Sequence, residues 1–271
     1  MFLAVPRAAR APRGSICSKM NELNWPEGYG RRMLPEVDST NAEGLRLASG
    51  LAGPTWIFAA RQVAGRGRRG RAWSDPDGNF AASLVLKPEG TPAQAALRSF
   101  VAALALHDAL SAAAPGADLA LKWPNDVLLG GGKVAGILLE GAGLGARMNH
   151  LVIGFGVNLS NAPEQGVAAI QPVSLRAGAG VLVVADVLLG HLARSYAARE
   201  AVFVAEGFGP IRADWLARAA RLGHEVIART MRDEIRGRFD DVDDAGNLVL
   251  STASGRRVIP AADVFFESET G

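Results

Sequence analysis

The chain has 271 residues, which is enough for one large domain with a small appendage. Hydrophobic residues make up 49% and charged residues 21%, a composition that excludes an intrinsically disordered protein. No apolar run approaches roughly eighteen residues, so we expect neither a membrane-spanning helix nor a membrane partner. Cys17 is the only cysteine, which excludes a disulfide within the chain and favours a reducing cytoplasm.

The formal net charge of +2 is set by the N-terminal segment. The first nineteen residues hold four basic and no acidic side chains, and the remainder holds 25 basic and 27 acidic ones. Such a body lacks the basic surface that binds nucleic acid, so we expect no nucleic-acid partner. We interpret residues 1–28 as a leader that is disordered or not translated, with Met20 as a start site. The alternative is an arginine-rich targeting peptide.

Caps, turn residues and hydrophobic periodicity predict the elements in chain order. The first half is predicted to contain helix 42–48 after the capping residues 38–41, strand 55–60, loop 65–71, strand 79–86 and a helix from Thr91 to about 114. The buried face of that last helix is expected to carry Leu97, Phe100, Val101 and Leu104. The second half is predicted to contain strands 119–123, 127–129, 134–140 and 151–158, then helices 181–199 and 210–221.

Short strands separated by turns fill the end of the chain. Their predicted ranges are 225–228, 234–241, 248–250, 256–259 and 263–267. About fifty residues of this kind are typical of a small β-barrel. The sequence therefore predicts an α+β fold with such a barrel appended to its body.

Gly65–Arg71 packs four arginines and three glycines into seven residues. Glycine lets backbone N–H groups approach a ligand closely, and guanidinium groups clamp carboxylates or phosphates. The loop therefore suits an anionic substrate. An RNA-binding arginine/glycine segment or a solvated loop is an alternative for this motif alone.

Two further motifs lie in the central strands. Lys133 follows a glycine turn, where its ammonium can serve a phosphate or carboxylate, although a solvated strand-end lysine is the commoner case. Asn125 and Asp126 can reach a nucleotide or a metal, or can simply form a turn. Gly154-Phe155-Gly156-Val157-Asn158 permits close backbone approach to a ligand, but alone it is weak evidence.

The order and spacing of these motifs carry more information than any one of them. Asp38-Ser39-Thr40-Asn41, the segment from Arg61 to Trp73, Lys122-Trp123-Pro124-Asn125-Asp126, the block from Lys133 to Leu138, and Ile153 to Asn158 together resemble the catalytic core of biotin–protein ligases. The resemblance covers about residues 29 to 268. It implies a mixed β-sheet catalytic domain flanked by helices, residues 29–221, and a small C-terminal SH3-like β-barrel, residues 222–271.

The resemblance also implies site residues and substrates, namely biotin and ATP, with Mg²⁺. The positions that match biotin contacts are Ser39, Thr40, Asn41, Gln62, Arg66, Gly67, Arg68 and Lys133. The positions that match contacts to ATP or the adenylate are Arg71, Trp73, Asn125 and Asn158. Lys133 and Arg68 would be catalytic, because they neutralise the biotin carboxylate and the α-phosphate as the two anions meet.

The remaining expectations concern metals, partners and assembly. We assign no metal ligand: Asp126 and Glu140 could help to hold Mg²⁺, but a structural role is at least as well supported. The implied partner is a biotin carboxyl carrier protein or domain, such as that of acetyl-CoA carboxylase, and the enzyme would be a cytoplasmic monomer or homodimer. About thirty residues precede the core, too few for a winged helix-turn-helix, so repressor activity is not expected.

Two rival functions also fit parts of this sequence. A lipoate–protein ligase shares the implied fold and the lysine-centred adenylation, but the arginine/glycine loop and the Lys-Trp-Pro-Asn block favour biotin. A nucleic-acid-binding module would use the arginine run. The acidic balance of the body and the lack of interleaved aromatic residues oppose it.

Overall fold

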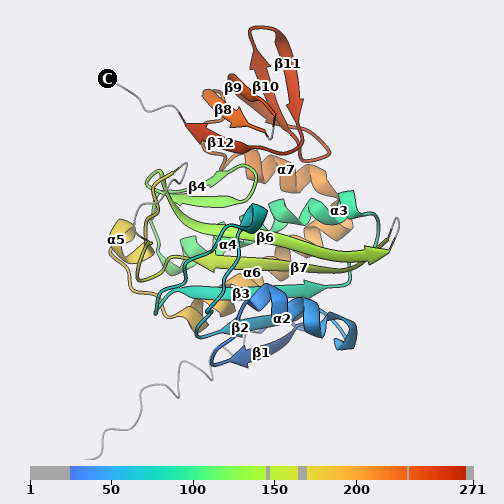
Figure 1. The fold of residues 1–271 in the computed structure, drawn as a ribbon, viewed down its shortest axis with the longest axis vertical. Coiled ribbons are helices and arrows are strands. Elements are labelled where there is room, and N and C mark those ends of the chain that lie inside the picture. The colour runs from blue at the N-terminus through green and yellow to red at the C-terminus, as the bar shows by residue number, and fades with distance from the viewer. Residues whose placement is uncertain (1–24, 145–146, 164–169, 231, 267–271) are drawn as a thin grey trace, which may run out of the picture.

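A computed structural model of the chain describes residues 25–144, 147–163, 170–230 and 232–266. Most of the predicted leader, residues 1–24, lies outside these ranges. The described chain forms two sheets with helices between and beside them (Figure 1). The predicted α+β architecture is confirmed.

The large sheet has seven strands in the order β1-β2-β3-β7-β6-β5-β4. Only β1 and β2 pair in parallel, and all other neighbours are antiparallel, so the sheet is mixed as expected. Its strands are β1 (Gly30–Leu34), β2 (Thr55–Ala59), β3 (Phe80–Leu86), β4 (Leu119–Lys122), β5 (Asp126–Leu129), β6 (Gly132–Leu144) and β7 (Arg147–Val157).

Both faces of this sheet are covered, which explains why β2 and β3 are buried at every position. Because alternate side chains of a strand point to opposite faces, Trp56 and Leu84 enter one hydrophobic cluster, and Ile57 and Val85 enter another. Helix α2 (Thr40–Leu47) contacts β3 and β7 on the face of the smaller cluster.

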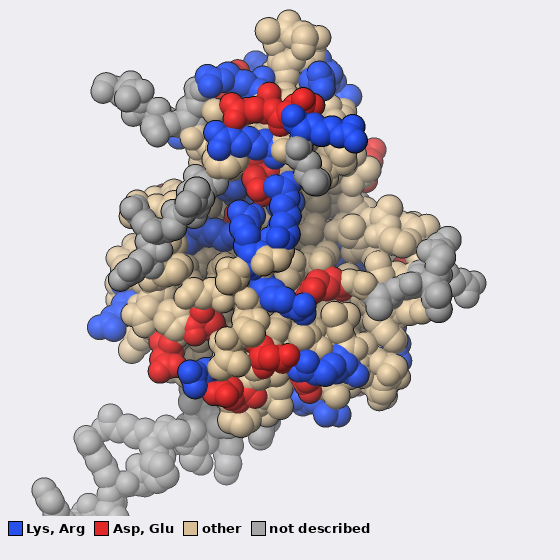
Figure 2. All heavy atoms as spheres, in the orientation of Figure 1, with Lys and Arg blue, Asp and Glu red and all other residues tan. Residues whose placement is uncertain are grey.

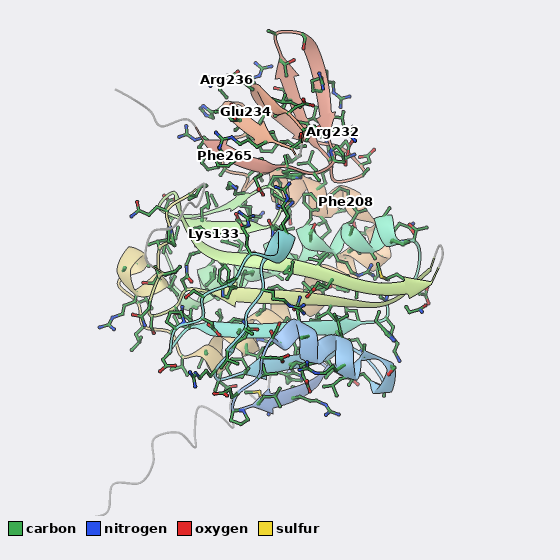
Figure 3. All side chains as sticks on the ribbon, viewed as in Figure 1. Lys133, Phe208, Arg232, Glu234, Arg236 and Phe265 are labelled. Carbon is green, nitrogen blue, oxygen red and sulfur yellow. The ribbon has the colours of Figure 1, made fainter. Side chains whose placement is uncertain are left out.

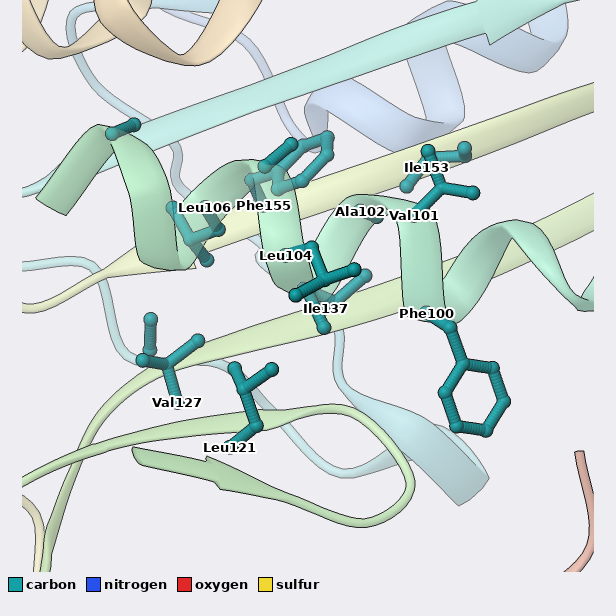
Figure 4. Packing of buried hydrophobic residues seen from close by; sticks show 14 of the residues in the cluster. Phe100, Val101, Ala102, Leu104, Leu106, Leu121, Val127, Ile137, Ile153 and Phe155 are labelled. Atoms are coloured by element: carbon teal, nitrogen blue, oxygen red, sulfur yellow. The ribbon is translucent and has the colours of Figure 1, made fainter. Parts of the chain in front are cut away.

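The larger cluster lies under the long helices. Helix α4 (Arg98–Ala113) packs against α6 (Ala185–Glu206) and α7 (Phe208–Leu216), and it also contacts β4, β5 and β6. Leu104 and Leu106 of α4 face Ile137 and Phe155 of the sheet (Figure 4). Residues Pro92–Ala113 are apolar and long enough to span a bilayer, but most of α4 is buried in this core.

Several predicted boundaries in the body were wrong. The predicted helix from Thr91 to 114 is divided at Leu97, which is only half-buried, into α3 (Pro92–Ala96) and α4. Helix α6 begins later and ends later than predicted, α7 ends before 221, and both β1 and the short helix α5 (Leu175–Ala179) were missed. Helix α5 carried local signals that were overlooked, because Ser174 caps its start and Gly180 its end.

All five predicted C-terminal strands are present and form an antiparallel sheet in the order β11-β10-β9-β8-β12. They are β8 (Glu225–Arg229), β9 (Glu234–Val242), β10 (Leu248–Thr252), β11 (Gly255–Ile259) and β12 (Asp263–Phe266). Strands β11 and β12 are its two edges. This sheet stands above the body and meets it at α7 and at the end of β4 (Figure 1).

Candidate functional site

A cavity of about 370 Å³ opens between the body and β12. Its volume suits a small-molecule ligand. All twelve residues predicted to contact biotin or ATP line it: Ser39, Thr40, Asn41, Gln62, Arg66, Gly67, Arg68, Arg71, Trp73, Asn125, Lys133 and Asn158. Residues that span 120 positions of the sequence therefore meet at one place.

The first wall of the cavity is the N-terminal turn of α2. Ser39 caps the helix, and its hydroxyl accepts a hydrogen bond from the backbone N–H of Ala42 at 3.4 Å. Gln62 Oε1 accepts bonds from the Thr40 backbone N–H at 2.9 Å and from Thr40 Oγ1 at 3.2 Å. Ser39, Thr40 and Asn41 are all buried, so their polar groups are fixed in place.

The two glycines of the Gly-x-Gly motif are needed because side chains of the site lie against them. A Cβ atom at Gly154 would come within 2.2 Å of Asn41 Oδ1, and one at Gly156 would come within 2.4 Å of Trp73 Cε2. Both distances are far below van der Waals contact. The motif therefore lets Asn41 and Trp73 lie flat on β7.

Three charged side chains meet at the centre of the cavity. Asp126 Oδ1 lies 2.6 Å from Lys133 Nζ, and its Oδ2 lies 3.5 Å from Lys122 Nζ. Burial alone would raise the pKa of Asp126, but the two lysines outweigh it and hold that pKa below its usual value. Burial lowers the pKa of Lys122. Lys133 Nζ also lies 5.7 Å from the centroid of the Trp73 ring, within cation–π range.

The arginine/glycine loop is joined to the C-terminal sheet through one carboxylate. Asp263 of β12 lies 2.8 Å from Arg69, 3.5 Å from Arg71 and 3.7 Å from Arg68. Burial lowers the pKa of Arg68, and Asp263 opposes that shift. Figure 2 shows Lys and Arg side chains gathered where the C-terminal sheet meets the body. The loop thus presents a cationic wall in which Asp263 is a neutralising anion.

The two predicted asparagines brace the backbone around Lys133. Asn158 is buried, and its Nδ2 donates to the carbonyls of Val173 at 3.2 Å and Lys133 at 3.4 Å. Asn125 Nδ2 donates to the carbonyl of Ile137. Asn158 Oδ1 is buried and has no hydrogen-bond partner among the described residues.

Comparison with known proteins identifies the family of the chain. A model of the biotin/lipoate A/B protein ligase family matches residues 33–158, and one of the biotin protein ligase C-terminal domain matches residues 222–267. A biotin–[acetyl-CoA-carboxylase] ligase of Paracoccus denitrificans is 54% identical over 238 residues, which are 86% of this chain and 99% of that protein. This chain belongs to the biotin protein ligase family.

More distant members of the family agree with the first. The biotin–[acetyl-CoA-carboxylase] ligase of Mycobacterium tuberculosis is 34% identical and covers 88% of this chain and 90% of its own length. The structure of the biotin protein ligase from Aquifex aeolicus in complex with biotin and ATP matches with a TM-score of 0.74 at 25% identity, over 87% of this chain and 97% of that one.

Some residues that line the cavity were not predicted for it. Lys122 lies within a motif that the sequence had singled out, so its position was a usable signal. Asp263 and Phe265 come from β12, more than 130 residues after Asn125. Figure 3 shows Lys133 on the body and Phe265 on the C-terminal sheet above it. Nothing local in the sequence of β12 marks these two residues for the cavity.

Metal ligands are scarce at the site. Within the described residues, no group of three or more His, Cys, Asp or Glu side chains gathers to hold a metal. The two candidate carboxylates are already engaged, Asp126 by two lysines and Glu140 by Asn41 and Arg66.

Proposed function

We propose that this chain is a biotin–protein ligase that forms biotinyl-5′-AMP from biotin and ATP and then transfers biotin to a lysine of a biotin carboxyl carrier domain. The observation that carries the proposal is the convergence on one cavity of a polar helix end, a cationic loop and Lys133. The first suits a small ring with donors and acceptors, and the other two suit a carboxylate beside a phosphate.

One end of the cavity would bind the ring system of biotin, and the other end would bind the nucleotide. The ring system of biotin would lie against Ser39, Thr40, Asn41 and Gln62, where an unpaired buried polar group would cost about 1 to 3 kcal/mol. Trp73 would offer a flat face to the adenylate, while Asn125, Asn158 and Arg71 would contact the nucleotide. Arg66 and Gly67 would cover biotin from the loop.

In the first step, a carboxylate oxygen of biotin attacks the α-phosphorus of ATP. A new P–O bond forms, the bond to the β-phosphate bridge breaks, and pyrophosphate leaves. Two anions must meet, so the main task of the protein is to align them and neutralise their charge. Lys133 and Arg68 would do this, with Asp126 holding the Lys133 ammonium in place.

In the second step, the amine of the acceptor lysine attacks the acyl carbon of the mixed anhydride. A C–N bond forms, the C–O bond to AMP breaks, and the nitrogen loses a proton. The arginine/glycine loop, held by Asp263, would keep water away from the anhydride until the acceptor arrives.

The proposal extends to ions, partner and location. Mg²⁺ would arrive with ATP and be held chiefly by phosphate oxygens and water, as it commonly is. The acceptor would be the carrier domain of acetyl-CoA carboxylase or a related carboxylase, in the cytoplasm, with the ligase as a monomer or homodimer. The relative from Paracoccus denitrificans carries acetyl-CoA carboxylase in its name, which supports that choice.

A pyrophosphate-exchange assay tests the function directly. The chain is incubated with ATP, labelled pyrophosphate and either biotin or lipoate, and labelled ATP is measured. We expect exchange with biotin and none with lipoate. Exchange with lipoate alone would identify a lipoate–protein ligase, and exchange with neither would remove the adenylation step altogether.

A further inference from the structure

Two side chains behind the first wall of the cavity hold that wall together without lining the cavity themselves. Ser83 of β3 is fully buried, and its Oγ lies 2.6 Å from Asn41 Oδ1 and 2.8 Å from Thr40 Oγ1. Glu140 of β6 has its Oε2 at 2.8 Å from Asn41 Nδ2 and 3.8 Å from Arg66 Nη2. Both residues therefore act on the cavity through their neighbours.

The orientation of the Asn41 amide follows from its partners. Its nitrogen faces the Glu140 carboxylate and, at 3.3 Å, the carbonyl of Leu138. A carboxylate and a carbonyl only accept hydrogen bonds, so the NH₂ group must lie on that side. Asn41 Oδ1 then faces Ser83, and the single proton of the Ser83 hydroxyl is donated to it.

This assignment fixes the Thr40 hydroxyl in turn. Ser83 Oγ also lies 2.8 Å from Thr40 Oγ1, so the two hydroxyl groups hold each other in place. Gln62 Oε1, which already accepts from the Thr40 backbone, is only an acceptor. The one proton of the Thr40 hydroxyl is therefore used within the wall, and its free lone pair is left for the cavity.

Ser39 has the opposite polarity. Its hydroxyl oxygen accepts from the Ala42 backbone N–H, while its proton has no partner within the wall. The end of the cavity thus offers a hydrogen-bond acceptor at Thr40 beside a donor at Ser39. A ligand with an N–H next to a C=O is complementary to this pair, and a cyclic urea has that pattern.

We propose that Glu140 and Ser83 are positioning residues that set the hydrogen-bond polarity of the biotin end of the cavity. This inference rests on the proposed function, because it takes the cyclic urea to be the ring of biotin. Glu140 has a second contact with Arg66, so it also joins the wall to the arginine/glycine loop. Neither residue touches the reacting atoms, so their effect should fall on biotin binding and not on ATP.

The test compares Ser83→Ala, Glu140→Ala and Glu140→Gln with the unchanged chain. Ser251→Ala is the matched control, because that hydroxyl pairs with Asp240 in the C-terminal sheet. Biotin binding without ATP is measured by calorimetry, and the KM values for biotin and ATP by pyrophosphate exchange. Glu140 is half-buried, so its variants remain informative even where Ser83→Ala fails to fold.

We expect Ser83→Ala and Glu140→Ala to weaken biotin binding about tenfold or more, with the KM for ATP within about twofold. Glu140→Gln should recover much of the loss, because its amide oxygen still accepts from Asn41. Unchanged biotin binding in all variants, or equal rises in both KM values, would overturn the inference while the function stands. If the chain without substitutions shows no biotin-dependent pyrophosphate exchange, the proposed function itself is refuted.

Discussion

Lys133 combines several interactions of the site. Its ammonium pairs with Asp126 and lies over Trp73, while its backbone N–H and carbonyl bond to Gln171 and Val173. These contacts fix both ends of a flexible side chain. A lysine held in this way can align two anions without a further loss of side-chain conformational entropy.

We therefore predict that Lys133→Ala lowers the rate of biotinyl-AMP formation by about 10²- to 10³-fold or more. Biotin binding should remain measurable by calorimetry, because the ring end of the cavity is unchanged. Lys87→Ala is the control, since that ammonium bonds the Leu51 carbonyl away from the cavity. An exchange rate equal to that of the unchanged chain would refute the assigned role.

Asp75 gives a prediction about pH. Burial raises its pKa from 3.8 to about 6, and Oδ1 has no partner among the described residues. Because the folded state holds this proton more tightly than the unfolded state, the carboxyl favours folding most below pH 4. That contribution is lost as the pH rises through 6.

Asp75→Asn should accordingly raise the free energy of unfolding at pH 7.5 by about 1 to 2 kcal/mol and have little effect at pH 4. The gain is smaller than the full pKa difference would give, because the Asp75 carboxyl is partly exposed to solvent. Denaturant titrations at the two pH values measure the difference. Asp244→Asn, at an exposed carboxylate in the turn between β9 and β10, is the control. A gain of the same size at both pH values for Asp75→Asn would contradict the pKa assignment.

At the scale of elements, the sequence predicted the strands well and the helix boundaries less well. Strands β2, β3 and β7 are short apolar runs between turn residues, so their existence followed from pattern alone. Strand β1 was missed because it is an edge strand that contains Arg31 and Arg32, so apolar and polar residues do not alternate along it. Its extended conformation is evident only from its pairing with β2. The break at Leu97 depends on how α3 and α4 pack, which local propensity does not report.

The sequence predicted which residues of the body gather at the candidate site, because these residues lie in compact motifs at strand ends and turns. What the sequence could not supply was the contribution of β12. Asp263 and Phe265 reach the cavity only because the C-terminal sheet is placed over the arginine/glycine loop. Such a contact depends on three-dimensional packing and leaves no local pattern.

The contact between β12 and the loop leads to a third prediction. Asp263→Asn removes the carboxylate that is shared by three arginines of the loop. Each of these ion pairs contributes about 0.2 to 1 kcal/mol to the stability of the contact between the loop and β12. We expect trypsin to cut the loop at Gly65–Arg71 about three- to tenfold faster, as measured by mass spectrometry. Added salt should reduce the difference between the variant and the unchanged chain, because it screens these pairs.

Asp240→Asn supplies the matched control for that experiment. Asp240 pairs with Arg238 on the same small sheet, remote from the loop. If both variants are cut at the same rate, general loosening of the C-terminal sheet, and not loss of the Asp263 contact, explains the change.

At the scale of the whole molecule, the two sheets share one core. Trp215 of α7 is buried and contacts Phe100 of the body at 5.3 Å and Phe239 of β9 at 6.5 Å between ring centroids. Trp123 Nε1 donates to the Gly246 carbonyl at 3.0 Å, and Arg212 pairs with Asp241. Contacts of this density couple the unfolding of both parts.

Trp215→Ala should lower the free energy of unfolding by about 3 to 5 kcal/mol, because it leaves a cavity between the two parts. Calorimetry should still record a single transition at a lower temperature. A second calorimetric transition in the chain without substitutions, from separate unfolding of the C-terminal sheet, would contradict the idea that the two parts share one core. Exposed Val204→Ala, on α6, serves as the comparison and should change little.

The position of β12 also affects how the protein can be studied. Among the described strands, this edge strand pairs with β8 alone, yet it supplies Asp263 and Phe265 to the cavity. A purification tag or fluorescent fusion joined directly behind it would begin within a few residues of the cavity rim. An assay with the tag at that end would report the tag as well as the enzyme, so kinetic measurements need the opposite end or a cleavable linker.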